Sequence, residues 1–258
     1  MKCLSWDVAA GTDRGKVRED NQDNYYISPD QRIFVVADGM GGEKGGALAS
    51  RLAVEAVEAL FWEQIPDCNN EEAIQEWLME AVSRANQSVY SVRISNPDVA
   101  RLGTTIVVAA QSDSGRVSIA HLGDSRAYKI TANDIAVVTQ DHSVGFELLL
   151  RGQITTEQYE SSPFRNFLTR CVGHEAQVTI DQSPVMLEAG DWLLMCTDGL
   201  TGVLQEDKIA RIVHETGDPE AACAELIKQT LEGGAPDNVT IVCARYAEKT
   251  APVEAGST

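Results

Sequence analysis

Five aspartates stand where turn-like segments meet strand-like runs of the sequence. Asp38 and Asp198 each end an apolar run (IFVVAD and WLLMCTD), and each is followed by glycine and another apolar residue. Asp124 also lies beside a glycine, Asp237 precedes the last β-rich run, and Asp23 lies in the polar segment DNQDN. Any one of them alone is typical of a turn. Their recurrence at strand ends is what points to a shared site.

These carboxylates would meet if two stacked sheets placed their strand ends at one edge. Unpaired carboxylates at close range repel each other, so a cluster of them requires a cation. An all-oxygen ligand set favours Mg²⁺ or Mn²⁺ over Zn²⁺. The six cysteines are scattered, with no CxxC pair and no zinc-like spacing. The pattern therefore predicts a divalent-metal site made of aspartates.

Composition excludes several classes of protein. The 258 residues include 21 Lys and Arg against 39 Asp and Glu, a formal net charge of −18. Nucleic-acid binding and docking on anionic lipid both need clustered basic residues, so this balance disfavours them. No window reaches the roughly 18 apolar residues that span a bilayer, and no signal-peptide core precedes the charge at Asp7. We expect a cytoplasmic protein with reduced cysteines.

Hydrophobic periodicity predicts a single domain of mixed helices and strands. Helices are expected at residues 46–65, at 206–215 and at 219–231. Another is expected to start at Asn69 or Asn70 and to end before Pro97, with an apolar stripe made of Ile74, Leu78, Ala81, Ala85 and Val89. Strands are expected at 32–38, 104–110, 117–122, 126–130, 135–138, 178–182, 192–197 and 239–246. The four strands between 104 and 138 read as an antiparallel meander, because SDSG, GDS and TAND are turn sequences. The polar segment 142–169 is expected to form a flap, and 248–258 a frayed tail after a domain of residues 1–247.

Six segments occur in an informative order: REDNQD (18–23), VVADGMGG (35–42), RLGTT (101–105), HLGDSRAY (121–128), CTDGL (196–200) and APDNVTIV (235–242). Together they resemble the metal-dependent PP2C-type (PPM) family of serine/threonine protein phosphatases, and above all its compact bacterial members. The resemblance extends from about Val8 to Tyr246. It implies an α+β fold, a four-layer α-β-β-α sandwich in which two antiparallel sheets lie between helical layers.

The resemblance also implies a set of metal ligands. Asp38 would bridge two metal ions, with the Gly39 carbonyl as a ligand of one of them, and Asp198 and Asp237 would hold the other. The implied cofactors are two tightly bound Mn²⁺ or Mg²⁺ ions. The implied reaction is hydrolysis of phosphoserine or phosphothreonine by a hydroxide that the two ions share. No protein nucleophile is needed for this reaction.

Other roles follow from the same resemblance. Asp23 matches an acid that contacts a metal through water, and Asp124, with Asp198, matches the place where many bacterial members bind a third, weaker ion. Arg18 matches the phosphate-binding arginine, whose planar fork grips two phosphate oxygens at once. The implied catalytic set is Arg18, Asp38 and Asp198.

The acid that protonates the leaving group is not fixed by the motifs. Many eukaryotic relatives carry a histidine where this chain has Met40, and close bacterial relatives often carry one where it has Glu43. A metal-bound water, Glu43 and His142 of the flap are the candidates, and such a group typically contributes about 10²–10⁴-fold in rate. The glycine-rich segment 39–46 does not match the phosphate-loop spacing, so ATP binding there is not expected.

Competing functions share this fold. A catalytically dead module that binds a phosphoprotein is one, and the presence of Asp38, Asp198 and Asp237 argues against it. A phosphatase of anti-sigma-factor antagonists would use the same chemistry on another substrate, and the motifs leave it open. We expect a monomer whose partners are phosphorylated proteins, opposing serine/threonine kinases in bacterial signalling. The flap is expected to select the substrate.

Overall fold

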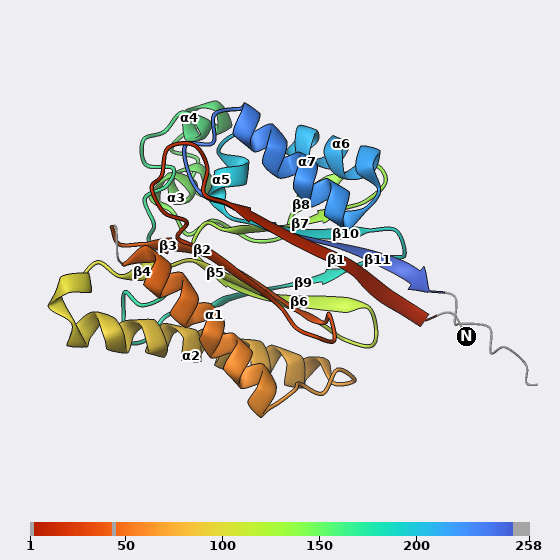
Figure 1. The fold of residues 1–258 in the computed structure, drawn as a ribbon, viewed down its shortest axis with the longest axis horizontal. Coiled ribbons are helices and arrows are strands. Elements are labelled where there is room, and N and C mark those ends of the chain that lie inside the picture. The colour runs from red at the N-terminus through yellow and green to blue at the C-terminus, as the bar shows by residue number, and fades with distance from the viewer. Residues whose placement is uncertain (1–2, 43–44, 250–258) are drawn as a thin grey trace, which may run out of the picture.

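Two antiparallel β-sheets pack face to face between two helical layers in a computed structural model of the chain (Figure 1). The structure describes residues 3–42 and 45–249. The predicted four-layer α-β-β-α sandwich is therefore confirmed. Glu43 lies outside the described residues, as do 250–258 of the predicted tail.

Each sheet combines hairpins of consecutive strands with strands that are distant in sequence. The first sheet has the order β1-β11-β10-β7-β8, formed by Cys3–Asp13, Val239–Lys249, Trp192–Cys196, Arg126–Ile130 and Ile135–Val137. The second has the order β2-β3-β5-β6-β9, formed by Asp23–Ile27, Ile33–Met40, Ile106–Gln111, Arg116–Leu122 and Asp181–Met186, and the short β4 (Gly103–Thr104) pairs with β3. The chain thus passes repeatedly between the sheets, and the passage from β6 to β7 carries Asp124.

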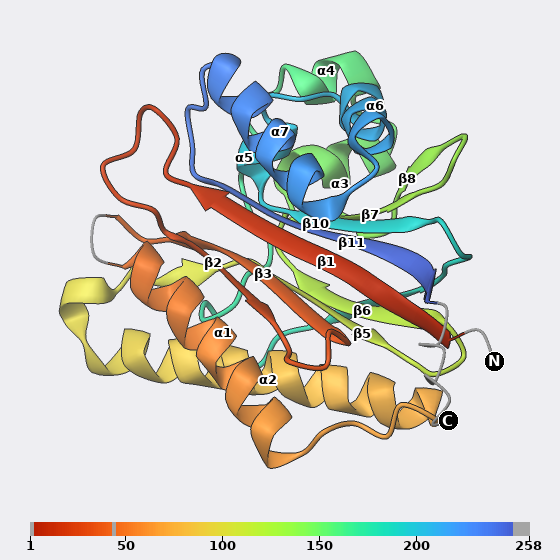
Figure 2. The ribbon, with the colours of Figure 1, turned by 45° about the vertical axis from the view of Figure 1, so that its right-hand side comes forward.

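The helices cover the outer faces of the sheets. Helices α1 (Gly46–Glu63) and α2 (Glu71–Ser95) pack on the second sheet, and α6 (Glu206–Thr216) and α7 (Pro219–Glu232) on the first (Figure 2). The short helix α5 (Asp198–Thr201) follows β10, a 3₁₀ turn spans Pro97–Val99, and the predicted flap contains α3 (Val144–Leu150) and α4 (Thr156–Glu160).

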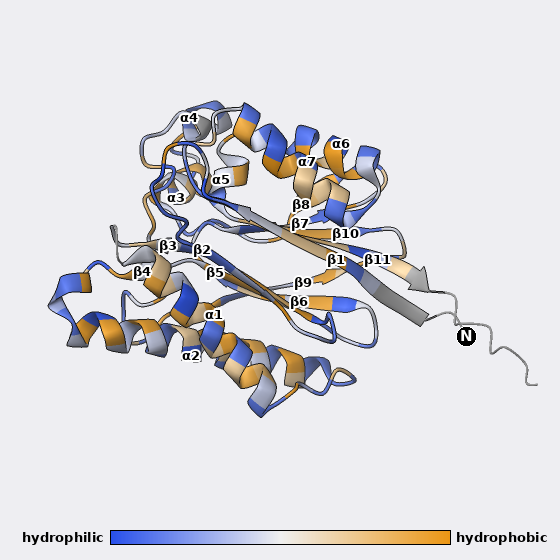
Figure 3. Cartoon of the chain, in the orientation of Figure 1, coloured by the Kyte–Doolittle hydropathy of each residue, from blue (hydrophilic) through white to orange (hydrophobic). Residues whose placement is uncertain are grey.

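Helix α2 shows how local sequence sets an element. The side chain of Asn70 accepts hydrogen bonds from the backbone N–H groups of Glu72 and Ala73, so Asn70 rather than Asn69 is the N-cap. The expected apolar stripe is buried: Ile74, Leu78, Ala81, Ala85 and Val89. In Figure 3 both α1 and α2 alternate between hydrophobic and hydrophilic along their length. Burial of one face is what holds such amphipathic helices on a sheet.

The two sheets are joined by a core of large apolar side chains. Five of its buried members are Trp6, Phe34, Val36, Met195 and Val242, which come from strands of both sheets. Further apolar clusters fill the space between each sheet and its helices. Removing apolar surface from water contributes roughly 25 cal/mol per Å². This rigid core fixes the sheet edges against each other.

The predicted meander is wrong at one connection. Strands β5 and β6 form a hairpin in the second sheet, and β7 and β8 form one in the first, so the chain changes sheets between Leu122 and Arg126. A Gly-Asp-Ser turn has the same local chemistry whether it closes a hairpin or crosses between sheets, and only long-range pairing decides. As a consequence, Asp124 lies between the two sheets.

Other boundaries differ by a few residues. β9 begins at Asp181, not at 178, and β11 continues through Lys249, two residues beyond the expected domain end. Strands β1 and β2 are not among the predicted strands; β2 has only five residues and begins with the polar pair Asp23 and Asn24. Among the described residues, no helix combines the length and apolar character needed to cross a membrane. The cysteines with described side chains are free thiols: Cys68, Cys171, Cys196, Cys223 and Cys243.

Candidate metal centre

Aspartates from both sheets converge on one cavity. Asp38 lies near the end of β3, Asp124 in the crossing between β6 and β7, Asp198 at the first residue of α5, and Asp237 just before β11. All of them line a cavity of ≈ 930 Å³, which Gly39 and Arg18 also line. The expectation that strand ends bring these carboxylates together therefore agrees with the geometry.

Asp23 lies behind this cavity rather than on its wall. Its partner across the β2–β3 ladder is Asp38. The Thr197 hydroxyl donates to Asp23 Oδ2 at 2.9 Å, whereas Oδ1 is buried and has no hydrogen-bond partner. Asp198 Oδ1 is likewise buried and unpartnered. A buried polar atom without a hydrogen-bond partner lowers the stability of the fold. These two oxygens are therefore suited to binding a cation.

Burial and mutual repulsion shift the titration of these acids. Burial, followed by the charge of Asp23, raises the pKa of Asp38 well above its usual range. Burial raises the pKa of Asp23 to about 7. The pKa of Asp124 is also raised, by burial first and by Asp198 next. A divalent cation would remove this penalty, because it favours the charged form of every carboxylate around it. The donor set, made of hard oxygens, suits Mn²⁺ or Mg²⁺.

The backbone of Asp38 is clamped by two threonines. Its N–H donates to Thr105 Oγ1 at 2.9 Å, and its carbonyl accepts from Thr104 Oγ1 at 2.7 Å and from the Thr105 N–H at 2.9 Å. Both threonines are buried. The GTT segment thus fixes the backbone from which the Asp38 side chain projects.

Asn238 organises the other side of the cavity. Its Oδ1 accepts from the Gln22 N–H at 2.9 Å, and its Nδ2 donates to the carbonyls of Arg14 and Asp20 at 2.8 and 2.9 Å. A Cβ on Gly199 would lie 1.8 Å from the Asn238 carbonyl oxygen, so only glycine allows α5 to start here. Sequence reasoning gave Asn238 no role. Its place directly after Asp237 was the available signal.

Arg18 lies at the mouth of the cavity. Its Nη2 donates to Asp237 Oδ2 at 2.6 Å, and 56% of its side chain is exposed. The ion pair raises the pKa of Arg18 above its ordinary value, chiefly through the hydrogen bond to Asp237. Arg18 is therefore a fixed positive charge beside the acids, open to solvent and to an incoming anion.

His142 does not face the cavity. It is buried, and it hydrogen-bonds with the Gly123 N–H and with Asp181, away from the cavity lining. Its candidacy as the leaving-group acid is therefore wrong, because no incoming group can reach it. Met40, which carries no ionisable group, does line the cavity, and so does His174.

Comparison with known proteins decides the family. A family model described as Protein phosphatase 2C matches residues 10–232. The chain belongs to this family. The predicted resemblance and the enzyme class, protein-serine/threonine phosphatase, are thereby confirmed.

Relatives of this PP2C phosphatase are similar over most of its length. The serine/threonine phosphatase stp of Listeria welshimeri is 34% identical over 234 residues, which cover 90% of this chain and 92% of the relative. Protein phosphatase PhpP of Streptococcus pneumoniae is 34% identical over 249 residues, covering 95% and 99%. A solved structure of the PstP catalytic domain in complex with two manganese ions matches with a TM-score of 0.84 at 29% identity, covering 95% of this chain and 99% of that one.

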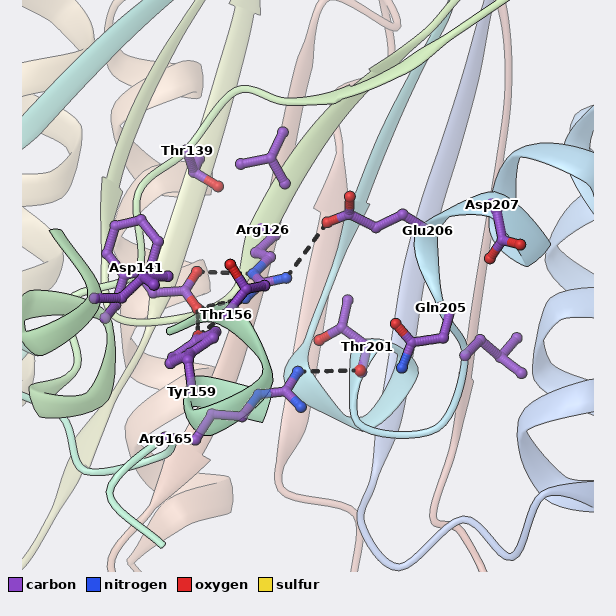
Figure 4. A pocket seen from close by; sticks show the side chains of 14 residues that line it. Arg126, Thr139, Asp141, Thr156, Tyr159, Arg165, Thr201, Gln205, Glu206 and Asp207 are labelled. Carbon is purple, nitrogen blue, oxygen red and sulfur yellow. Dashed lines mark hydrogen bonds and ion pairs between the residues drawn. The ribbon is translucent and has the colours of Figure 1, made fainter. Parts of the chain in front are cut away.

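A second cavity separates the flap of this PP2C phosphatase from its body (Figure 4). It measures ≈ 370 Å³. Arg126 forms two hydrogen bonds to Asp141 at 2.8 and 2.6 Å, and the Tyr159 hydroxyl of α4 donates to the same carboxylate at 2.8 Å. Arg165 of the flap donates to the Thr201 carbonyl of α5 at 3.1 Å. These bonds fasten the flap beside the helix that begins with Asp198.

Proposed function

We propose that this chain hydrolyses phosphoserine and phosphothreonine in proteins with two Mn²⁺ or Mg²⁺ ions, and that it opposes serine/threonine kinases in bacterial signalling. The observation that carries the proposal is the convergence of four buried or half-buried carboxylates, those of Asp38, Asp124, Asp198 and Asp237, on one cavity with Arg18 at its mouth. The PstP structure that contains two manganese ions supports the choice of cofactor.

The proposal assigns a role to each acid. Asp38 and the Gly39 carbonyl would hold one ion, and Asp38, Asp198 and Asp237 the other. When bound, two divalent ions supply a nucleophile at neutral pH and neutralise charge on the phosphoryl oxygens. Asp23 would act through water, consistent with its place behind the cavity wall.

The remaining residues bind and orient. Arg18 would grip the phosphate, while its bond to Asp237 holds the guanidinium beside the other residues that line the cavity. Asp124 would hold a third, weaker ion together with Asp198; both line the cavity. A module that only binds phosphoproteins is less well supported, because it would gain nothing from keeping so many mutually repelling buried acids.

We assign substrate choice to the flap, residues 142–169. Phe167 lines the cavity and is 63% exposed, and Phe164, whose ring meets it edge to face, is 49% exposed. The carbonyls of both residues accept hydrogen bonds from the first turn of α3, at Val144 and Gly145. The backbone thus presents two large apolar side chains to solvent beside the reaction site, and exposed apolar patches mark binding surfaces. A substrate with a bulky apolar residue near its phosphorylated side chain fits this surface.

A direct assay tests the proposal. Hydrolysis of a phosphoserine peptide and of p-nitrophenyl phosphate is measured with Mn²⁺, with Mg²⁺ and with excess chelator. Metal-dependent turnover of both substrates that Asp38→Ala abolishes is expected. A folded wild-type protein that binds the peptide without turnover would favour the binding module.

The cellular setting is part of the same proposal. We propose one phosphatase domain that works as a cytoplasmic monomer on phosphorylated proteins. Phosphoproteomics of a deletion strain identifies the substrates, including any anti-sigma-factor antagonist. Sedimentation and cell fractionation measure the oligomeric state and the location.

A further inference from the structure

His142 connects the Asp124 loop to β9 through both nitrogens of its ring. Nδ1 accepts the Gly123 N–H at 3.2 Å, and Nε2 lies 3.2 Å from Asp181 Oδ2. The backbone N–H of His142 also donates to the Gly123 carbonyl at 2.9 Å. Because an amide N–H can only donate, Nδ1 must be the acceptor. Nε2 therefore carries the proton and donates it to Asp181.

Arg170 fixes the carboxylate at the end of this chain of bonds. Its Nη1 donates to Asp181 Oδ1 at 2.6 Å and its Nη2 to Oδ2 at 3.1 Å, a two-pronged pairing. The bond from Arg170 lowers the pKa of Asp181 to about 2, and burial lowers the pKa of His142 to about 4. A charged carboxylate and a neutral ring are the states that these hydrogen bonds need.

The hydrogen bonds of His142 hold the Gly123 peptide, which directly precedes Asp124 in the cavity lining. Gly123 has φ +104°, in the region that favours glycine, and a Cβ there would lie 2.5 Å from Thr105 Cγ2. The next residue is Asp124, so the orientation of this peptide decides where that carboxylate points. His142 also ties down the flap, because its carbonyl accepts the Thr169 N–H at 2.8 Å.

His142 and Asp181, together with the neighbouring His121, do not form a separate metal site. Ligand-type atoms of His121, His142 and Asp181 lie within 4.8 Å of one another, and the two imidazole rings are stacked. However, both ring nitrogens of His142 and both carboxylate oxygens of Asp181 already have hydrogen-bond partners. The positively charged guanidinium of Arg170 also lies against the Asp181 carboxylate. A cation would have to displace these bonds.

We propose that His142 is a positioning residue for Asp124, held in one tautomer and one orientation by Asp181 and Arg170. It touches neither the reacting atoms nor the ions. The proposal rests on the assigned role of Asp124 in binding the weaker ion. Partners one step removed from a metal ligand typically change metal affinity or activity by about 10–100-fold when replaced. We therefore expect His142 to set the affinity of the weaker site.

Two substitutions separate positioning from space filling. In His142→Asn the side-chain oxygen replaces Nδ1 and still accepts from Gly123, whereas His142→Gln keeps a donor near Asp181 but loses the acceptor at Nδ1. Glutamine is closer to histidine in size. A space-filling role therefore predicts that His142→Gln is the milder change, and the positioning role predicts that His142→Asn is.

Mn²⁺ binding, measured by calorimetry on the purified protein, gives a readout independent of activity. The binding event lost in Asp124→Ala defines the weaker site. We expect its dissociation constant to rise about 10-fold or more in His142→Gln, and several-fold less in His142→Asn. Asp181→Ala, which frees the tautomer, is expected to raise the same constant. His214→Gln, at an exposed histidine, is the matched control and should match the wild type.

Several results would overturn the proposal. His142→Gln binding Mn²⁺ as tightly as His142→Asn would do so, and so would an unchanged weaker site in Asp181→Ala. A binding event that His142→Gln removes and Asp124→Ala keeps would make His142 a ligand instead. If the wild type bound Mn²⁺ but turned over no phosphopeptide, the proposed function would fail while the binding comparison still tested His142.

Discussion

Asp23 and Asp38 face each other across the β2–β3 ladder, with their Cα atoms in register. Like charges directly opposite on paired strands are destabilising, and burial raises the pKa of both carboxyls. The same sheet edge that the sandwich core makes rigid therefore holds a pair that weakens the metal-free protein. The carboxylates that the proposed metal site needs are thus the ones that lower the stability of the metal-free protein.

Asp38→Asn should raise the stability of the metal-free protein and lower its metal-dependent activity. We expect the metal-free variant to resist urea better than the wild type by on the order of 1–2 kcal/mol, since one of the repelling buried charges is removed. Mn²⁺-dependent hydrolysis should fall more than about 100-fold. Urea unfolding in chelator and a p-nitrophenyl phosphate assay measure the two effects. Glu76→Gln, at an exposed acid of α2, is the control; a destabilised Asp38→Asn protein would argue against repulsion.

The free energy of unfolding should depend on pH because of the titration of His142. Burial lowers its pKa in the folded protein to about 4 from an ordinary 6.5. Between these values the unfolded chain binds a proton that the folded protein does not, so this contribution to stability is complete above pH 6.5 and is lost as pH falls toward 4. The loss amounts to at most about 3 kcal/mol.

His142→Asn removes this titration, while Asp181, Arg170 and His121 still face the site. Relative to the wild type, the variant should therefore gain stability steadily from pH 7 to pH 4. Urea unfolding in metal-free buffers across this range measures the difference. Parallel profiles for the two proteins would show that His142 does not titrate as its burial requires.

Arg18 should act on substrate binding. Arg18→Ala is expected to raise KM for a phosphopeptide about 10-fold with a smaller change in kcat, because a charge-assisted pair with phosphate is lost. Arg18→Lys should recover only part of this, since an ammonium cannot grip two oxygens as a fork does. Steady-state kinetics measure both constants, with Arg51→Ala, an exposed arginine of α1, as the control. An unchanged KM would contradict the phosphate-binding role.

Phe167 should matter only for extended substrates. Phe167→Ser is expected to lower kcat/KM several-fold for a phosphopeptide with an apolar residue beside the phosphoserine. It should leave p-nitrophenyl phosphate, which has no such neighbour, unchanged. Ile65→Ser replaces an equally exposed apolar residue outside the cavity lining and serves as the control. Equal losses on both substrates would mean that Phe167 supports the flap instead of contacting the peptide.

Sequence alone determined the local features and the family resemblance. Helical stripes, the strand runs and the acids at strand ends are set by neighbours a few residues apart, where periodicity and turn chemistry act. The motifs around Asp38, Asp198 and Asp237 pointed to the PP2C family and hence to the layered fold. These features are sufficient to predict a metal centre and the type of its donor atoms.

Tertiary structure decided how distant segments meet. Turn chemistry predicts a hairpin at Asp124, and only strand pairing places this residue between the sheets. The sequence makes His142 a candidate acid, yet the residue is buried, and Gly123 and Asp181, 19 and 39 residues away, occupy both nitrogens of its ring. Such contacts depend on which strands pair across the whole chain, and no local pattern encodes that. Strand pairing also places Asp23 opposite Asp38. The repulsion between these two carboxylates therefore arises from the tertiary structure and not from a local sequence pattern.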